Sequence, residues 1–98
     1  MTIGSILPVY ARADLTLEKG EGVYVYAKDG TRYLDFLSGI AVNALGHCHP
    51  HLVKALQTQA TKLWHVSNVF YNEPLQKLSD RLVENTFADT VFFCNSGS

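Results

Sequence analysis

The last four residues of the chain, Asn95-Ser96-Gly97-Ser98, are the stretch best suited to binding chemistry. They follow the apolar run Thr90 to Cys94, which is typical of a strand buried on both faces. A strand that passes through small polar residues into a helix points unpaired backbone N–H groups at one spot, and such a spot binds phosphate. Gly97 would let an anion approach the backbone, and Ser96 and Ser98 would add hydroxyl donors. A plain turn has the same composition, so that alternative stays open.

A second cluster of reactive side chains lies in Gly46-His47-Cys48-His49-Pro50-His51. Imidazole and thiolate groups are good zinc ligands. Structural zinc sites usually draw ligand pairs from separated segments, however, and only the single residues His65 and Cys94 remain elsewhere. We therefore favour a tight loop that makes its turn at Gly46 and enters a helix at Pro50.

Three further groups could contact a substrate or a partner. Tyr10 lies in a stretch without periodicity, and Ile40 lies in the small apolar segment 38–43. Packing explains both residues adequately. Residues 65–71 are richer in polar and aromatic groups than a connector needs, which favours a buried interface.

The elements that must position these residues divide into four stretches. Residues 1–21 predict an extended arm, because Pro8 disfavours helical dihedrals at the residue before it. Asp29-Gly30 predicts a hairpin with a two-residue type I′ turn. A turn of that length would place Tyr26 opposite Tyr33 and Val25 opposite Leu34. A lone hairpin is marginal in water, so we expect it to dock on further structure.

Apolar spacings of three and four predict two helices. The first runs from Pro50 to Trp64. The second has Asn72 as its N-cap and Pro74 in its first turn, and it ends near Asn85. The final strand over residues 90–94 needs neighbours that the hairpin cannot supply, so we expect the chain to stop within a strand-loop-helix unit whose remainder lies elsewhere.

Composition narrows the class of protein. At 98 residues and 47% hydrophobic residues, the chain is long enough and apolar enough for one folded domain. Eight basic and nine acidic residues leave a net charge of −1 with no block of like charges, which argues against nucleic acid or an anionic membrane as partner. No apolar run approaches the roughly 18 residues of a membrane span. Without a visible secretory signal, we expect a cytoplasmic location, with Cys48 and Cys94 as reduced thiols.

Segments along nearly the whole chain, in order, carry a family resemblance. The matching residues are Tyr10-Ala11-Arg12, Gly20-Glu21-Gly22-Val23-Tyr24, Asp29-Gly30, Tyr33-Leu34-Asp35-Phe36, Ser38 to Pro50, His65-Val66-Ser67-Asn68, Phe70-Tyr71 and Phe92 to Ser98. They resemble the class III pyridoxal-phosphate-dependent aminotransferases. Within that family, the form Gly39-Ile40-Ala41-Val42 favours the acetylornithine branch, because ornithine-type members have an aromatic residue where Ile40 stands.

The resemblance implies an α/β fold, the N-terminal portion of a fold-type-I PLP transferase. Residues 1–49 would form the N-terminal arm and the small-domain hairpin. Residues 50–89 would form a helical segment leading to the large domain. Residues 90–98 would form the first large-domain strand and the start of the phosphate-binding loop.

By the same resemblance, Ser96, Gly97 and Ser98 would bind the phosphate of the cofactor pyridoxal 5'-phosphate. The family usually has Thr at the position of Ser98, and Ser keeps the hydroxyl donor. Tyr10 and Ile40 would line the substrate pocket. No catalytic residue and no metal ligand is expected within the chain.

The implied reaction moves the terminal amino group of N-acetylornithine to 2-oxoglutarate, in arginine biosynthesis, within a homodimer whose active sites lie at the interface. It requires a proton-transferring lysine, an acidic partner for the pyridine nitrogen and usually an arginine for the donor carboxylate. None is recognisable here, so we expect the 98-residue chain alone to be inactive. The alternatives are a related ornithine, succinylornithine or other omega-amino-acid aminotransferase, or a non-catalytic α+β module that docks a partner through residues 69–71.

Overall fold

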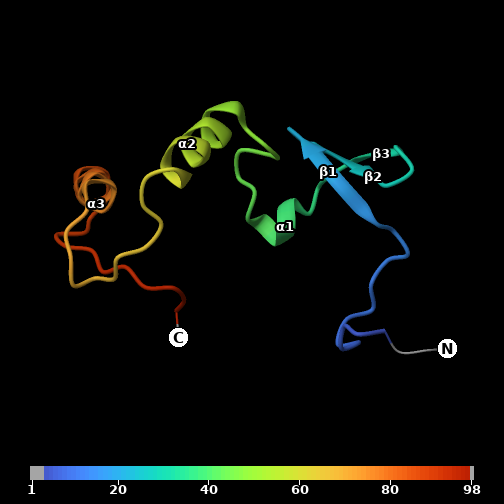
Figure 1. Ribbon diagram of the computed structural model, residues 1–98, viewed down its shortest axis with the longest axis horizontal. Coiled ribbons are helices and arrows are strands. Elements are labelled where there is room, and N and C mark those ends of the chain that lie inside the picture. Colours follow the sequence, from blue (N-terminus) through green and yellow to red (C-terminus); the bar gives the residue numbers. More distant parts are fainter. Residues whose placement is uncertain (1–3, 98) are drawn as a thin grey trace. The chain divides into compact units, whose positions relative to one another are not determined.

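The computed structural model describes residues 4–97. They divide into two compact units, one on each side of the boundary between Thr61 and Lys62, and each unit is described by itself. The first unit contains the strands β1 (Leu17–Glu21), β2 (Tyr24–Ala27) and β3 (Arg32–Leu34) (Figure 1). It also contains the short α1 (Ser38–Ala41) and the helix α2 (Pro50–Ala60), whereas α3 (Glu73–Asn85) belongs to the second unit.

The first unit is built on an antiparallel sheet with the strand order β1-β2-β3. The prediction of an extended arm up to residue 21 is wrong for its last part, because residues 17–21 form β1. This strand pairs with β2 through Lys19 opposite Tyr26 and Gly20 opposite Val25. Only Leu17 of its five residues has an apolar side chain, so the sequence lacks the alternation that reveals a strand, and the pairing is irregular between Leu17 and Lys19.

The hairpin between β2 and β3 is confirmed, but its predicted register is wrong by one residue. Tyr24 pairs with Leu34 and Val25 pairs with Tyr33. Within the loop 28–30, which the structure describes in full, only Gly30 has a positive φ, at 89°. A type I′ turn needs two such residues, whereas one αL glycine closes a longer loop with a G1 bulge. The Asp29 carboxylate stabilises this loop by accepting a hydrogen bond of 2.9 Å from the amide of Thr31.

One face of the sheet carries alternating cations and aromatic rings. Lys19 Nζ lies 5.1 Å from the ring centre of Tyr26, and the Arg32 guanidinium lies 4.4 Å from that of Tyr24. Both distances suit cation–π attraction. Ala27 at the end of β2 is buried, with 6% of its surface exposed.

The first predicted helix is confirmed as α2, but it is shorter than expected. It begins at Pro50 as predicted and ends at Ala60 rather than at Trp64. Thr61 is the C-cap, and its hydroxyl donates a 2.9 Å hydrogen bond to the carbonyl of Thr58. A threonine hydroxyl that bonds nearby backbone competes with continuation of the helix, so the apolar spacing extends beyond the helix itself.

The second predicted helix is confirmed at both ends as α3. Asn72 is the N-cap, and its side-chain Oδ1 accepts a 2.9 Å hydrogen bond from the amide of Leu75. Pro74 lies in the first turn, where its missing N–H costs no helical hydrogen bond. Glu73 places a negative charge at the positive end of the helix dipole.

The predicted strand over residues 90–94 is not a strand within the part of the chain that the structure describes. Val91 to Cys94 belong to no helix or sheet, and 83% of the surface of Phe92 is exposed. A strand exists only through hydrogen bonds to a neighbouring strand, so an apolar β-branched run cannot form one where no neighbour is present.

Within residues 4–97, no helix combines the length and the apolar character needed to cross a membrane.

Candidate functional site

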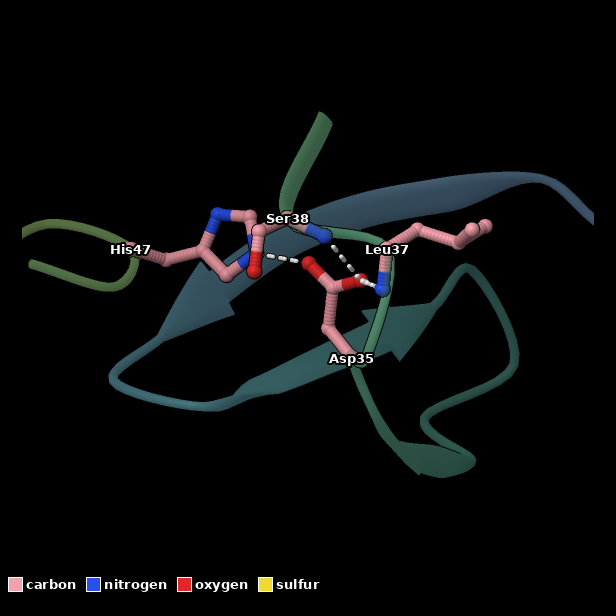
Figure 2. Close-up of polar contacts among 4 residues, drawn as sticks. All are labelled: Asp35, Leu37, Ser38 and His47. Atoms are coloured by element: carbon pink, nitrogen blue, oxygen red, sulfur yellow. Dashed lines mark hydrogen bonds and ion pairs between the residues drawn. The ribbon is translucent and has the colours of Figure 1, made fainter. Parts of the chain in front are cut away.

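The most organised polar cluster of the first unit is centred on Asp35, directly after β3. Its Oδ1 accepts hydrogen bonds of 3.0 Å from the amides of Leu37 and of Ser38. Its Oδ2 lies 2.6 Å from Nε2 of His47 (Figure 2). An ionised carboxylate only accepts hydrogen bonds, so the imidazole proton lies on Nε2. The hydrogen bond from His47, followed by that from the Ser38 amide, lowers the pKa of the Asp35 carboxyl below its ordinary value.

The backbone of His47 is anchored independently of its ring. Gly22 donates to the His47 carbonyl at 2.9 Å, and His47 donates to the Gly22 carbonyl at 2.8 Å. Gly46 has a φ of 78°, and a Cβ there would lie 2.7 Å from the Gly22 oxygen. A Cβ on Gly20 would lie 2.5 Å from Cγ of the His47 ring. The glycines therefore permit the close approach that brings His47 to Asp35.

Four consecutive residues after this cluster have positive φ. They form α1, with φ values of 52° at Ser38, 65° at Gly39, 63° at Ile40 and 61° at Ala41. L-residues other than glycine rarely adopt this left-handed region, and a β-branched residue such as isoleucine is a genuine outlier there. The turn is closed by hydrogen bonds from Val42 and from Asn43 to the Ser38 carbonyl, at 2.8 and 2.9 Å.

The two residues expected to line a substrate pocket lie in the first unit. Ile40 projects from the left-handed turn with 86% of its surface exposed. Tyr10 is exposed as well, and its ring centre lies 5.7 Å from the guanidinium carbon of Arg12. Among residues 4–97, no hydrogen bond or ring contact joins Tyr10 to Ile40.

The residues expected to bind phosphate lie in the second unit. Ser96 and Gly97 are exposed, and Ser98 lies outside the described residues. A Cβ on Gly97 would meet no heavy atom of the described chain within 4 Å, so its backbone is open to an approaching group. The Cys94 Sγ donates to the Ser96 carbonyl at 3.0 Å, and the Ser96 hydroxyl and the Gly97 amide are groups that can donate to an anion. This donor set fits a phosphate group.

The His-Cys-His segment is a loop that enters a helix, as predicted. His49 is the N-cap of α2, and its Nδ1 accepts a 3.2 Å hydrogen bond from the amide of His51. Cys48 is a free, exposed thiol, as is Cys94. Within residues 4–97, no group of three or more His, Cys, Asp or Glu side chains is placed to hold a metal ion.

Sequence reasoning missed the Asp35–His47 pair. The two residues are 12 positions apart, and no spacing rule connects them. One local signal was present: an aspartate two residues before Leu37-Ser38-Gly39 is typical of an Asx turn, in which the carboxylate accepts from amides two and three residues later.

A family model described as aminotransferase class III matches residues 8–98. The chain belongs to the class III aminotransferase family. Members of this family depend on pyridoxal phosphate.

Curated relatives of this class III aminotransferase chain agree with that assignment. It is 63% identical over 93 residues to acetylornithine aminotransferase 1 of Bradyrhizobium diazoefficiens, a match that covers 95% of the chain and 23% of the relative. It is 58% identical over 93 residues to the acetylornithine/succinyldiaminopimelate aminotransferase of Yersinia pestis, again covering 95% of the chain and 23% of the relative. The chain therefore spans about a quarter of the length of these relatives.

Solved structures of class III aminotransferases share the fold. N-acetylornithine aminotransferase from Stenotrophomonas maltophilia K279a matches with a TM-score of 0.82 and 47% identity, over 90% of this chain and 24% of that one. Ornithine aminotransferase from Toxoplasma gondii, a structure described with partial occupancy of PLP at the active site, matches with a TM-score of 0.83 and 30% identity, over 88% of this chain and 20% of that one. The predicted fold class, the N-terminal part of a PLP aminotransferase, is confirmed.

Proposed function

We propose that this chain is the N-terminal part of an aminotransferase that moves the terminal amino group of N-acetylornithine to 2-oxoglutarate, using pyridoxal 5'-phosphate. The observation that carries the proposal is the family match over residues 8–98, together with a relative of this name at 63% identity. That reaction would serve arginine biosynthesis. The contribution of the chain is to bind the cofactor phosphate and to shape one side of the substrate pocket.

The phosphate-binding contribution falls to Ser96, Gly97 and Ser98. Bound pyridoxal phosphate supplies an electron sink that stabilises the carbanion formed at the donor carbon. The Ser96 hydroxyl and the open backbone at Gly97 are donors of the kind that hold a phosphate dianion. Their role is to fix the position of the cofactor, while proton transfer belongs to residues beyond this chain.

The substrate-binding contribution falls to Ile40 and Tyr10. The exposed Ile40 side chain is held on a backbone turn of defined geometry, which suits an apolar wall against the acyl group of the donor. The Tyr10 ring offers a flat surface and a hydroxyl at the edge of the pocket, and the neighbouring guanidinium of Arg12 limits its orientation.

Homodimerisation is part of the proposal. Residues 69–71 present a continuous exposed surface, in which 100% of Tyr71 and 66% of Phe70 are exposed. Large aromatic side chains are enriched at the buried cores of protein interfaces. We expect a second subunit to cover this segment, and Tyr71→Asp in the complete protein to shift sedimentation from dimer to monomer.

The decisive experiment is an activity assay on the complete protein that contains this segment. We expect glutamate to form from 2-oxoglutarate when N-acetylornithine is the donor, and to form at least tenfold more slowly with ornithine. Equal or faster turnover of ornithine, or of an N-succinylated diamine, would instead support the neighbouring substrate branches. The names of the Yersinia relative and of the Toxoplasma structure make both branches specific alternatives.

A non-catalytic docking module is the remaining alternative, favoured by the exposure of Phe70 and Tyr71. It requires the isolated 98-residue chain to unfold in one cooperative transition. A broad, non-cooperative loss of far-ultraviolet circular dichroism on heating would eliminate it.

A further inference from the structure

We infer that Asp35 and His47 are a positioning pair that fixes the left-handed turn carrying Ile40, and thereby sets the affinity for the amino donor. The inference rests on the proposed function, because it gives Ile40 its role at the substrate. Neither residue is placed at the reacting atoms. They act through the turn.

Asp35 connects the start of the turn to the ring of His47. Its two carboxylate oxygens divide between the start of the turn and the ring of His47. Oδ1 accepts from the amides of Leu37 and Ser38 at 3.0 Å, and Oδ2 meets Nε2 of His47 at 2.6 Å (Figure 2). Its own amide donates to the Val23 carbonyl at 2.8 Å, so the carboxylate is tied to the sheet through its backbone.

His47 is itself held in place by its backbone. Its backbone exchanges two hydrogen bonds with Gly22, in the turn between β1 and β2. Its side chain is 23% exposed and that of Asp35 is 14% exposed, so the pair is partly shielded from competing water. A hydrogen bond with an ionised acceptor at 2.6 Å is of the strong class. The pair therefore connects two fixed points of the sheet to the entry of the turn.

The left-handed turn over residues 38–41 needs such support. Its residues 38–41 all have positive φ, and three of them, Ser38, Ile40 and Ala41, carry a Cβ that opposes this conformation. Backbone of this kind persists only where its surroundings hold it, and it concentrates at binding and catalytic sites. Ile40 stands at the centre of the turn and is 86% exposed, so the support holds a side chain that the fold of this unit does not use for packing.

The test compares Asp35→Asn with Asp29→Asn in the complete protein. Asp29 is the matched control, because its carboxylate also accepts from a backbone amide in the same sheet but lies at the other end of the hairpin. We expect Asp35→Asn to raise the KM for N-acetylornithine about tenfold with kcat within threefold of the parent, and Asp29→Asn to change neither by more than twofold. A merely structural role would lower the amount of active enzyme and leave KM unchanged.

Two further variants make the role of His47 specific. His47→Gln keeps an N–H donor near the position of Nε2, so we expect its KM within threefold of the parent. His47→Ala removes the donor, and we expect the same tenfold rise as for Asp35→Asn. If His47→Ala does not fold, the contrast between His47→Gln and Asp35→Asn decides the question. Combined with Ile40→Ala, the Asp35→Asn change should raise KM by less than twofold, because its effect passes through Ile40.

Hydrogen exchange supplies a readout that does not depend on the reaction. We expect peptides covering residues 37–43 to exchange faster in Asp35→Asn than in the parent, and at the parental rate in Asp29→Asn. Unchanged exchange in Asp35→Asn would overturn the positioning of the turn, even if the parent transaminates N-acetylornithine. Faster exchange with an unchanged KM would overturn the link to the substrate. The parent could be inactive towards every amino donor while the exchange difference between parent and Asp35→Asn is still found. That result would show that the proposed function is wrong and that Asp35 nevertheless supports the turn.

Discussion

The Asp35 carboxylate accepts hydrogen bonds from His47 and from two backbone amides. Protonation of this carboxylate should therefore weaken these bonds and destabilise the fold. Its pKa in the folded chain is lowered from the ordinary 3.8. A lowered folded-state pKa gives a stabilisation that is fully present above the unfolded value and is lost as the pH falls through the folded value. We expect the difference in thermal midpoint between parent and Asp35→Asn to be present above pH 4 and to shrink as the pH falls below it. A constant difference down to pH 3 would contradict this.

Replacement by alanine should destabilise the fold to different extents at Gly22, which pairs with His47, and at Gly46, which precedes His47. Gly22 and Gly46 both have positive φ, at 57° and 78°. A Cβ on Gly22 meets no described atom within 4 Å, whereas one on Gly46 lies 2.7 Å from the Gly22 oxygen. We expect Gly22→Ala to reduce the free energy of unfolding by about 1–2 kcal/mol, from backbone strain alone. Gly46→Ala adds a backbone clash. We expect it to reduce the free energy of unfolding, measured with denaturant, by about 3 kcal/mol or more. Equal losses of unfolding free energy in the two variants would contradict the close contact between residue 46 and the Gly22 carbonyl.

How far the sequence predicts single residues depends on whether their signal is local. Asn72 and Pro74 act on the next few amides, so residue type and position sufficed to predict them. The pairing of Asp35 with His47 depends on the path of the chain between them. Ile40 shows the same limit, since its positive φ follows from how the turn is held and not from its residue type, which disfavours that conformation.

At the scale of elements, α3 offers the sharpest test of a predicted feature. The Asn72 side chain satisfies the amide of Leu75, which would otherwise lack a helical partner. We expect Asn72→Ala to lower the free energy of unfolding by about 1 kcal/mol, and Asn72→Asp to restore most of it because it keeps the acceptor. Asn85→Ala is the control at the opposite end, where the side chain donates to the Arg81 carbonyl at 2.8 Å on an exposed surface. A larger loss in Asn85→Ala than in Asn72→Ala would contradict the capping role.

The β elements were harder to predict than the helices, for a physical reason. Helices α2 and α3 are set by apolar spacing and caps within one segment. Strand β1 exists because β2 lies beside it, and the hairpin register depends on whether Asp29 adopts a positive φ, which the Asp-Gly pair permits but does not require. A one-residue shift moves each partner to the other face, so a small error in the turn becomes a large error in the sheet.

At the scale of the whole molecule, the exposure of large apolar side chains argues that these residues work within a larger assembly. Large apolar side chains left exposed in this number suit contact with further protein surface. Among the described residues, more than four fifths of the surface is exposed for Trp64, Phe87 and Phe92. The apolar run over residues 91–94 has the composition of a buried strand but pairs with no strand among the described residues, and we expect it to pair as one in the complete protein.

The same reasoning predicts that the 98-residue chain alone does not transaminate. The reaction requires a lysine buried enough to lose its proton readily. Every lysine of the chain is exposed: Lys19, Lys28, Lys54, Lys62 and Lys77. With added pyridoxal phosphate, the purified chain should form glutamate from N-acetylornithine and 2-oxoglutarate no faster than the free cofactor does, while the complete protein serves as the positive control. Turnover by the chain above that background would show that one of these exposed amines performs the proton transfer, and replacing each lysine in turn by Met would then identify it.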